Sequence, residues 1–347
     1  MSARAFITGT AGPSLTPDER TFLREAEPWG LILFSRNIET PTQVQRLTAS
    51  FRDLLGRNAP VLVDQEGGRV QRLGPPHWPL YPPAAAYTSL YRADAASGLA
   101  ATRLGARLIA HDLLDVGIDI DCLPVADVPV PGAHSIIGDR AYGDTVEEVV
   151  DLGRAAAEGL LAQGVLPVLK HIPGHGRATA DSHVGLPRVD TDHRTLAATD
   201  FAAFRELGDL PVAMTAHVVY SDIDPIAPAT TSVTVVREVI RGWIGFRGLL
   251  MSDDISMGAL AGSIGERAHA ALSAGCDVVL HCNGSFDEMQ AVAAAVPPLG
   301  GAASMRAEAA LACRVPHVAM APSDADDLRA RWTALMLQTA TVGKGRA

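Results

Sequence analysis

Short apolar runs recur along the chain and alternate with longer stretches of helical periodicity, and this alternation most constrains the fold. Eight runs have the length and composition of buried strands: Ala5–Thr8, Leu31–Phe34, Val61–Val63, Ile118–Cys122, Leu166–Leu169, Val212–Thr215, Leu249–Ser252 and Val278–His281. Stretches with helical spacing lie between most of these runs, and examples are Thr40–Leu55, Leu99–Val116, Val146–Gln163, Asp192–Leu207, Val233–Ile244 and Ile264–Ala274. Strands that alternate with helices pair in parallel through right-handed crossovers. The pattern therefore predicts an α/β fold, a single (β/α)8 TIM-type barrel with a C-terminal helical extension.

The chain shows no internal repeat, charge block or low-complexity linker at which two domains would meet. Its 347 residues suit one barrel with insertions, so we expect residues 1–347 to form a single domain. After Asn283 the spacing predicts helices over Phe286–Val296, Met305–Ala312 and Asp324–Leu337. The alternative is an open, doubly wound sheet. No G-x-G-x-x-G motif follows the first strand, which argues against a dinucleotide-binding version of that sheet.

The charge balance limits the partners. The chain has 29 Lys and Arg against 39 Asp and Glu, a formal net charge of −10 at pH 7. An acidic surface repels phosphate backbones and no Lys/Arg-rich stripe offsets it locally, so we expect no nucleic-acid partner. No segment reaches the ~18 uninterrupted apolar residues that span a bilayer, and Met1–Thr10 lacks the pattern of a secretory signal. We therefore expect a cytoplasmic protein with no membrane partner and, without a coiled-coil seam, a monomer.

Four cysteines are scattered without the paired spacing of a metal or redox motif: Cys122, Cys276, Cys282 and Cys313. In a reducing compartment such cysteines stay unpaired. We expect free thiols in buried or strand positions.

Polar residues follow five of the predicted strands, at the ends where (β/α)8 barrels assemble their active sites. They are Asp64 after the third strand, Lys170 and His171 after the fifth, His217 after the sixth, Asp253 and Asp254 after the seventh, and Asn283 after the eighth. One polar residue after a strand is commonly a helix cap or a turn residue. Five converging strand ends instead predict a functional site.

The third strand leads into Asp64-Gln65-Glu66-Gly67-Gly68-Arg69-Val70-Gln71-Arg72. Asp64 and Arg72 suit sugar recognition, because a carboxylate accepts from two vicinal hydroxyls while a guanidinium donates through a planar fork. The alternative is a structural Asp–Arg pair that holds the loop. Arg140 is a further candidate donor, although an ion pair with Asp139 or Asp144 explains it equally well.

The segment Lys170-His171-Ile172-Pro173-Gly174-His175-Gly176, followed by Asp181-Ser182-His183, concentrates reactive side chains on one loop. In an extended conformation Asp181 and His183 point to the same side. A carboxylate beside an imidazole fixes its tautomer and favours the imidazolium, which suits proton transfer near neutral pH. Asp181 and His183 are therefore a candidate general acid/base pair, and an Asx turn with an exposed histidine is the alternative.

Asp253 and Asp254 end the seventh predicted strand, and strand alternation allows only one of them to face the barrel axis. A carboxylate at this place is a candidate nucleophile, metal ligand or helix N-cap. The residues alone do not choose between these roles.

Taken together, four motifs resemble glycoside hydrolase family 3, and specifically its bacterial cytoplasmic β-N-acetylglucosaminidases of cell-wall recycling. The motifs are Asp64-Gln65-Glu66-Gly67-Gly68-Arg69-Val70, Lys170-His171-Ile172-Pro173-Gly174-His175-Gly176, Asp181-Ser182-His183 and Ser252-Asp253-Asp254-Ile255-Ser256-Met257. The resemblance runs from Phe6 to Asn283. Ile172 stands where an aromatic residue is common in the family and Ile255 where Leu is common, which changes packing near the loops.

The resemblance implies a role for each matched residue. Asp253 becomes the nucleophile and His183 the acid/base, with Asp181 as its orienting partner. The implied substrate contacts are Asp64, Arg72, Arg140, Lys170 and His171. Many members carry a second α/β domain that supplies a Glu acid/base, and the segment after Asn283 is too short for it. The acid is then expected from the barrel itself.

The resulting hypothesis is a retaining hydrolysis that removes terminal, non-reducing β-linked N-acetylglucosamine from a small saccharide or muropeptide. The reaction is expected to pass through a covalent glycosyl-enzyme and to need no cofactor or metal. Participation of the substrate's acetamido group is the rival mechanism. A phosphorylase with the same nucleophile is the closest alternative activity. A metal-dependent barrel hydrolase would use His171, His175, Asp181, His183 and Asp253, although Pro173 and Gly174 argue against a helical ligand pair. The remaining alternative is a sugar-binding barrel without catalysis.

Overall fold

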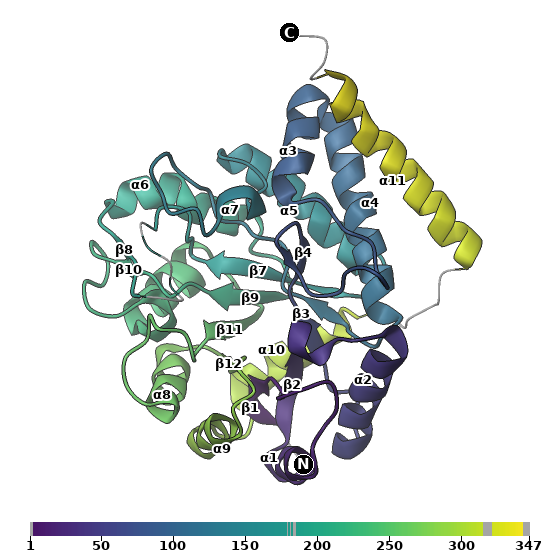
Figure 1. Ribbon diagram of the computed structural model, residues 1–347. Coiled ribbons are helices and arrows are strands. Elements are labelled where there is room, and N and C mark those ends of the chain that lie inside the picture. Colours follow the sequence, from purple (N-terminus) through teal and green to yellow (C-terminus); the bar gives the residue numbers. More distant parts are fainter. Residues whose placement is uncertain (1–2, 179, 181, 183–184, 315–320, 343–347) are drawn as a thin grey trace.

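The fold is described from a computed structural model, which describes residues 3–178, 180, 182, 185–314 and 321–342. Within this part of the chain, eight parallel strands close into a barrel in the spatial order β1, β12, β11, β9, β7, β6, β3, β2 (Figure 1). They are β1 (Arg4–Thr8), β2 (Pro28–Leu33), β3 (Val61–Val63), β6 (Ile120–Asp121), β7 (Leu166–Ile172), β9 (Val212–Thr215), β11 (Leu249–Asp254) and β12 (Val278–His281). Each overlaps one of the eight predicted runs, so the (β/α)8 prediction is confirmed.

Helices surround the barrel (Figure 1). They are α1 (Pro17–Ala26), α2 (Pro41–Leu55), α3 (Ala84–Ala93), α4 (Ala95–Leu114), α5 (Val146–Leu161), α6 (His193–Ala198), α7 (Asp200–Glu206), α8 (Ile264–Ala274), α9 (Phe286–Ala295), α10 (Gly301–Ala312) and α11 (Pro322–Val342). Two small sheets lie outside the barrel: the antiparallel pair β4 (Gln65–Gly67) and β5 (Val70–Gln71), and the parallel pair β8 (Arg188–Val189) and β10 (Val219–Tyr220). Single 3-10 turns are η1 (Ser35–Asn37), η2 (Gly138–Arg140) and η3 (Ala229–Thr231).

Two predicted helices differ in detail. The stretch predicted as one helix over Asp192–Leu207 is α6 and α7, because Thr199 adopts non-helical backbone angles (φ −126°, ψ −85°) between them. The stretch predicted over Val233–Ile244 is a π-helix, η4 (Val235–Trp243), rather than an α-helix. The periodicity located both segments but did not reveal the break or the wider turn.

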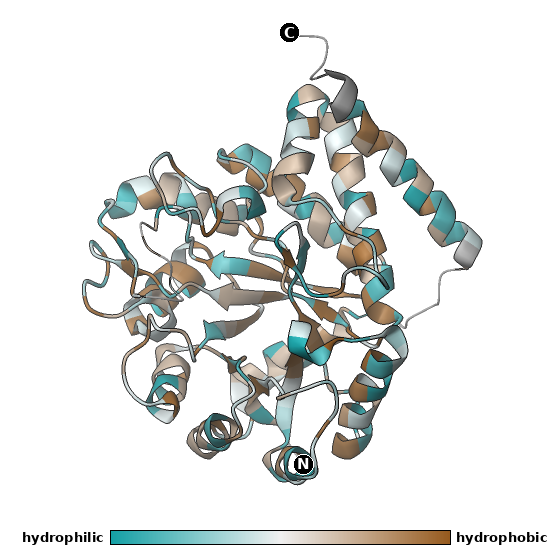
Figure 2. Cartoon of the chain, in the orientation of Figure 1, coloured by the Kyte–Doolittle hydropathy of each residue, from teal (hydrophilic) through white to brown (hydrophobic). Residues whose placement is uncertain are grey.

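The apolar core has two layers. Inside the barrel, alternate strand residues form one cluster, and the residues between them pack outward against the helices. In β11, Leu249 and Met251 face the interior while Leu250 faces the helices. The register of β11 against β12 shifts between Met251 and Asp254, so the alternation does not extend to Asp253 and Asp254, and both residues line the cavity described below. In Figure 2 the strands are mostly hydrophobic, whereas the helices carry both kinds of residue.

α10 closes the N-terminal end of the barrel. Its Ala307 and Ala310 join the interior cluster, and Arg306 Nη1 lies 2.7 Å from Asp277 Oδ1 at the start of β12. α11 packs against α3 and α4 on the outside (Figure 1). The opposite end of the barrel, where the strands terminate, carries the loops that form the site.

The four cysteines are free thiols, as expected. Cys122, Cys276 and Cys282 are buried, whereas Cys313 is exposed directly after α10. The expectation of a buried or strand position is therefore wrong for Cys313. Among the described residues, no helix combines the length and the apolar character that crossing a membrane requires.

Candidate active site

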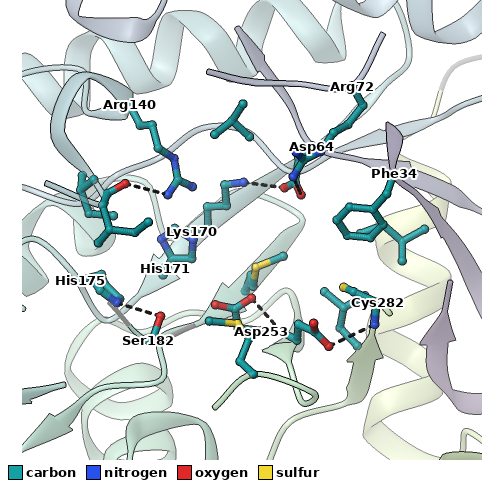
Figure 3. A pocket seen from close by; sticks show the side chains of 18 of the residues that line it. Phe34, Asp64, Arg72, Arg140, Lys170, His171, His175, Ser182, Asp253 and Cys282 are labelled. Carbon is teal, nitrogen blue, oxygen red and sulfur yellow. Dashed lines mark hydrogen bonds and ion pairs between the residues drawn. The ribbon is translucent and has the colours of Figure 1, made fainter. Parts of the chain in front are cut away.

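A cavity of about 370 Å³ opens at the C-terminal ends of the strands (Figure 3). Its floor is apolar, with Ile32, Met214 and Leu280 from the barrel interior. Its walls come from the ends of the strands and from the segments that follow them: Phe34, Arg36, Asp64, Arg69, Val70, Arg72, Ile136, Ile137, Arg140, Lys170, His171, His175, Ser182, Asp253, Asp254, Met257, Cys282 and Asn283. An apolar floor under converging polar groups is typical of a small-molecule site.

Five side chains form a chain of alternating charge along one wall. Lys170 Nζ lies 2.8 Å from Asp64 Oδ1 and 2.5 Å from Glu66 Oε1. Arg72 Nη2 lies 3.1 Å from Asp64 Oδ2, and its guanidinium stands 5.2 Å from the centre of the Phe34 ring. Arg140 donates two hydrogen bonds of 2.8 Å to the Glu66 carboxylate, from Nε and from Nη2. This bidentate geometry fixes the guanidinium plane.

The charges of these five side chains stabilise one another. Burial alone would raise the pKa of the Asp64 and Glu66 carboxyl groups, but Lys170 and the neighbouring arginines hold both below their ordinary values. Burial would likewise lower the pKa of Lys170, and the two carboxylates raise it. These three groups are therefore ionised at neutral pH, and guanidinium groups always are. Three cations against two anions leave an excess of positive charge and of hydrogen-bond donors facing the cavity.

The β4–β5 hairpin positions Glu66 and Arg72, and the turn of this hairpin requires glycine. Gly67 adopts φ +91°, which lies in the left-handed region, and a Cβ at this position would overlap the carbonyl oxygen of Pro82. The tight turn carries the chain from Glu66 back to Arg72.

A second cluster surrounds the buried carboxylate of Asp127. His171 Nδ1 lies 2.7 Å from Asp127 Oδ2, and the backbone N–H of His175 donates to Oδ1 over 2.6 Å. The His175 imidazole is buried beside the cavity, with Nε2 3.3 Å from Ser182 Oγ. Burial lowers the pKa of His175 to about 4, against the smaller opposing effect of Asp127. This ring is therefore neutral at physiological pH.

Asp253 and Asp254 have separate environments. Asp254 is bound to the backbone: Oδ1 accepts from the N–H of Ser256 at 3.0 Å and of Cys282 at 3.1 Å. Asp253 accepts only from the N–H of Asp254, at 2.8 Å, among the described residues. Burial would raise the pKa of Asp253, but the imidazoles of His217 and His171 lower it below its ordinary value. Asp253 is the ionised carboxylate that remains available to a ligand.

The structure brings together six of the eight predicted site residues: Asp64, Arg72, Arg140, Lys170, His171 and Asp253 all line the cavity. Arg140 pairs with Glu66, not with Asp139 or Asp144, which pair with Arg69 and Arg92. The other two, Asp181 and His183, lie outside the described residues. Ser182 between them lines the cavity.

Of the other three residues predicted at strand ends, Asp254 and Asn283 line the cavity. His217 is buried behind it, with Nε2 2.9 Å from the Asp254 carbonyl oxygen and Nδ1 2.7 Å from Thr230 Oγ1. His217 thus supports the turn that presents Asp253.

The sequence interpretation did not single out Glu66 or Asp127. Glu66 lies inside a motif that the sequence analysis used, but only Asp64 and Arg72 of that motif were predicted to contact a sugar. Asp127 follows the fourth strand and was open to the same strand-end rule that found Asp64 and Lys170. Its distance of six residues from β6 concealed it.

No three or more His, Cys, Asp or Glu side chains in the described ranges are grouped so as to hold a metal ion. The metal-dependent hypothesis included Asp181 and His183, which those ranges omit, so it stays a prediction.

The amino-acid sequence is similar to those of known proteins. The family model described as "Glycosyl hydrolase family 3 N terminal domain" matches residues 14–318. Proteins named Beta-hexosaminidase from Alkalilimnicola ehrlichii and Methylococcus capsulatus are each 42% identical, over 283 and 276 residues. These matches cover 80% and 78% of this chain and 80% of each relative.

A solved structure extends the similarity to the fold. NagZ from Neisseria gonorrhoeae, in complex with N-trifluoroacetyl-D-glucosamine, aligns with a TM-score of 0.85 at 29% identity. The alignment covers 97% of this chain and 98% of that one. The family model, the relatives and the barrel agree with the resemblance carried by the four motifs: the chain belongs to glycosyl hydrolase family 3.

Proposed function

We propose that this protein is a retaining β-N-acetylhexosaminidase that removes terminal, non-reducing β-linked N-acetylglucosamine. The observation that carries the proposal is Asp253, an ionised carboxylate that lines a cavity together with hydrogen-bond donors that suit a sugar. Its relatives are named hexosaminidases. Nothing in those names favours the phosphorylase alternative.

Asp253 acts as the nucleophile. In the first step its carboxylate attacks the anomeric carbon through an oxocarbenium-like transition state, and the bond to the leaving oxygen breaks. The product is a covalent glycosyl-enzyme. In the second step water attacks the same carbon and releases Asp253, which restores the starting stereochemistry.

His183 moves the proton, with Asp181 as its orienting partner. His183 donates a proton to the leaving oxygen in the first step and takes one from the attacking water in the second. This assignment comes from the family resemblance. Ser182, which lies between the two residues in the sequence and lines the cavity, supports it.

The charged wall binds the sugar. Asp64 accepts from hydroxyl groups, while Arg72, Arg140 and Lys170 donate to them, and His171 contacts the same ring. Because these groups are already paired with one another, they are fixed before the substrate arrives and lose little entropy on binding. The apolar floor excludes water beneath the ring.

The finer parts of the proposal follow from the resemblance. We propose a muropeptide or small saccharide substrate from peptidoglycan, a role in cell-wall recycling, a cytoplasmic location and a monomeric state. We also propose that residues 1–347 act as one catalytic domain.

The test compares wild type with two neighbouring variants on 4-nitrophenyl N-acetyl-β-glucosaminide. Asp253→Ala should abolish turnover, whereas Asp254→Asn should retain part of it because Asp254 binds backbone groups. A slow fluorinated N-acetylglucosaminyl substrate should leave an adduct on Asp253 that mass spectrometry detects. Turnover by Asp253→Ala at the wild-type rate would contradict the nucleophile, and turnover without an adduct would favour acetamido participation.

Further experiments test the general-acid role of His183 and the two alternative activities. His183→Ala should spare activated aryl glycosides more than natural substrates, because a good leaving group needs no proton. Equal loss on both substrates would count against the acid role. Loss of activity in chelator would revive the metal-dependent hypothesis, and dependence on phosphate would revive the phosphorylase.

A further inference from the structure

Asp127 is a fully buried carboxylate behind the cavity, and it is not among the described residues that line it. It lies on the loop after β6, close to the end of β7, where Val125 pairs with Lys170. Three donors point at it. His171 Nδ1 lies 2.7 Å from Oδ2, while the backbone N–H groups of His175 and His171 lie 2.6 Å and 3.3 Å from Oδ1.

This arrangement decides where the His171 ring carries its proton. Burial alone would raise the pKa of Asp127, but His171 and the backbone donor of His175 hold it below its ordinary value, so the group is a carboxylate. A carboxylate only accepts hydrogen bonds. The facing Nδ1 must therefore carry a hydrogen, in the neutral ring and in the imidazolium alike.

The other ring nitrogen is then the one that meets the ligand. His171 lines the cavity, and its Nε2 has no hydrogen-bond partner among the described residues. In the neutral ring with hydrogen on Nδ1, Nε2 is an acceptor. It complements the wall of donors formed by Arg72, Arg140 and Lys170.

We propose that Asp127 is a positioning residue that keeps a proton on His171 Nδ1, so that Nε2 is the nitrogen presented to a substrate hydroxyl. The inference rests on the proposed function for the contact between His171 and the sugar. The position of the proton itself can be measured without any substrate.

The substitution Asp127→Asn separates this role from a merely structural one. The amide oxygen must stay where two backbone N–H groups converge, because an NH2 group there would face two donors. The NH2 group then faces His171 Nδ1 and donates to it. The ring proton is forced onto Nε2, with almost no change in side-chain volume, as when a catalytic aspartate beside a histidine becomes asparagine.

Long-range ¹H–¹⁵N spectra of histidine-labelled protein read the tautomer directly. The His171 signals are identified by their loss in His171→Gln. In wild type we expect the shift of a protonated nitrogen at Nδ1, and in Asp127→Asn we expect that shift at Nε2. An unprotonated Nδ1 in wild type, or the same pattern in both proteins, would overturn the proposal, and the wild-type spectrum suffices if the variant does not fold.

Kinetics on 4-nitrophenyl N-acetyl-β-glucosaminide test the consequence. We expect Asp127→Asn to lower kcat/KM by about 10- to 100-fold. In a His171→Gln background the same change should cost less than about threefold, because the residue through which Asp127 acts has gone. Full, independent losses in both backgrounds would contradict the positioning role.

Asp277→Asn is the matched control. Asp277 is another buried aspartate that accepts a backbone N–H, from Leu250 at 2.9 Å, but it lies at the opposite end of the barrel. The substitution should lower stability and leave kcat/KM and the His171 spectrum unchanged. If wild type does not turn over the substrate, the proposed function fails, and the spectra still decide whether Asp127 sets the tautomer.

Discussion

Glu66 holds two cavity residues without being among the described residues that line the cavity. It is the common anion of Lys170 and Arg140, and its side chain is only 4% exposed. Glu66→Gln keeps the shape but removes the charge, which leaves Arg140 without a carboxylate partner among the described residues and Lys170 with Asp64 alone. We expect kcat/KM to fall at least about tenfold, mainly through a higher KM, because substrate contacts are displaced.

Stability provides the control for this substitution. Removing one partner of a buried ion pair costs about 3–5 kcal/mol of the free energy of unfolding, which denaturant titration measures. The exposed pair Arg154–Asp209, with N–O distance 2.6 Å, is the matched case. Asp209→Asn should cost at most about 1 kcal/mol and leave KM unchanged. A wild-type KM in Glu66→Gln would show that Lys170 and Arg140 hold their positions without it.

At the scale of the element, α11 is attached to the barrel by one face. Leu328 is 5% exposed and belongs to the core cluster that includes α3 and α4, whereas Leu337 on the same helix is 62% exposed. Leu328→Ala should lower the free energy of unfolding by about 2–4 kcal/mol, and Leu337→Ala by no more than about 0.5 kcal/mol. Both should keep wild-type kcat/KM. Equal effects of the two substitutions on unfolding would mean that α11 does not pack as described.

The elements were predictable where one local signal dominates. Buried strands of a parallel barrel are continuous apolar runs, and β3, β9 and β12 match their predicted bounds. α1 was not predicted, although Thr16 and Glu19 form a capping box with Pro17 after the cap. The break at Thr199 was beyond a periodicity argument, since its side chain bonds Arg177, 22 residues away.

At the scale of the whole molecule, the barrel topology made the site predictable in outline. Parallel strands in a closed barrel end on one side, so residues as far apart as Asp64 and Asp253 were expected to converge, and both line the cavity. The side chains with which the cavity residues pair were harder to predict. The pairing of Arg140 with Glu66 depends on how the loop after β6 folds over the β4–β5 hairpin, and side-chain pairs across two loops leave no periodic signal in a sequence.

The pH dependence of stability is a property of the whole molecule, and His175 contributes a separable part. Its folded-state pKa of about 4 lies below the ~6.5 of an unfolded chain. Between these values the unfolded state binds the proton and the folded state does not, so this contribution is present above pH ~6.5 and is lost as the pH falls towards about 4. The expected slope is about 1.4 kcal/mol per pH unit. Asp112, Asp121 and Asp200, whose pKa values burial raises, act in the opposite direction at low pH, so the total slope is not informative.

The measurement is therefore a difference between wild type and His175→Gln, with the free energy of unfolding determined by denaturant titration from about pH 4 to about pH 8. The three aspartates are common to both proteins and cancel in the difference. We expect the difference to be constant above about pH 7, and below about pH 6.5 the stability of wild type should fall more steeply than that of the variant. Parallel curves over the whole range would show that His175 takes up its proton in the folded protein as readily as in the unfolded chain, and that burial does not keep it neutral.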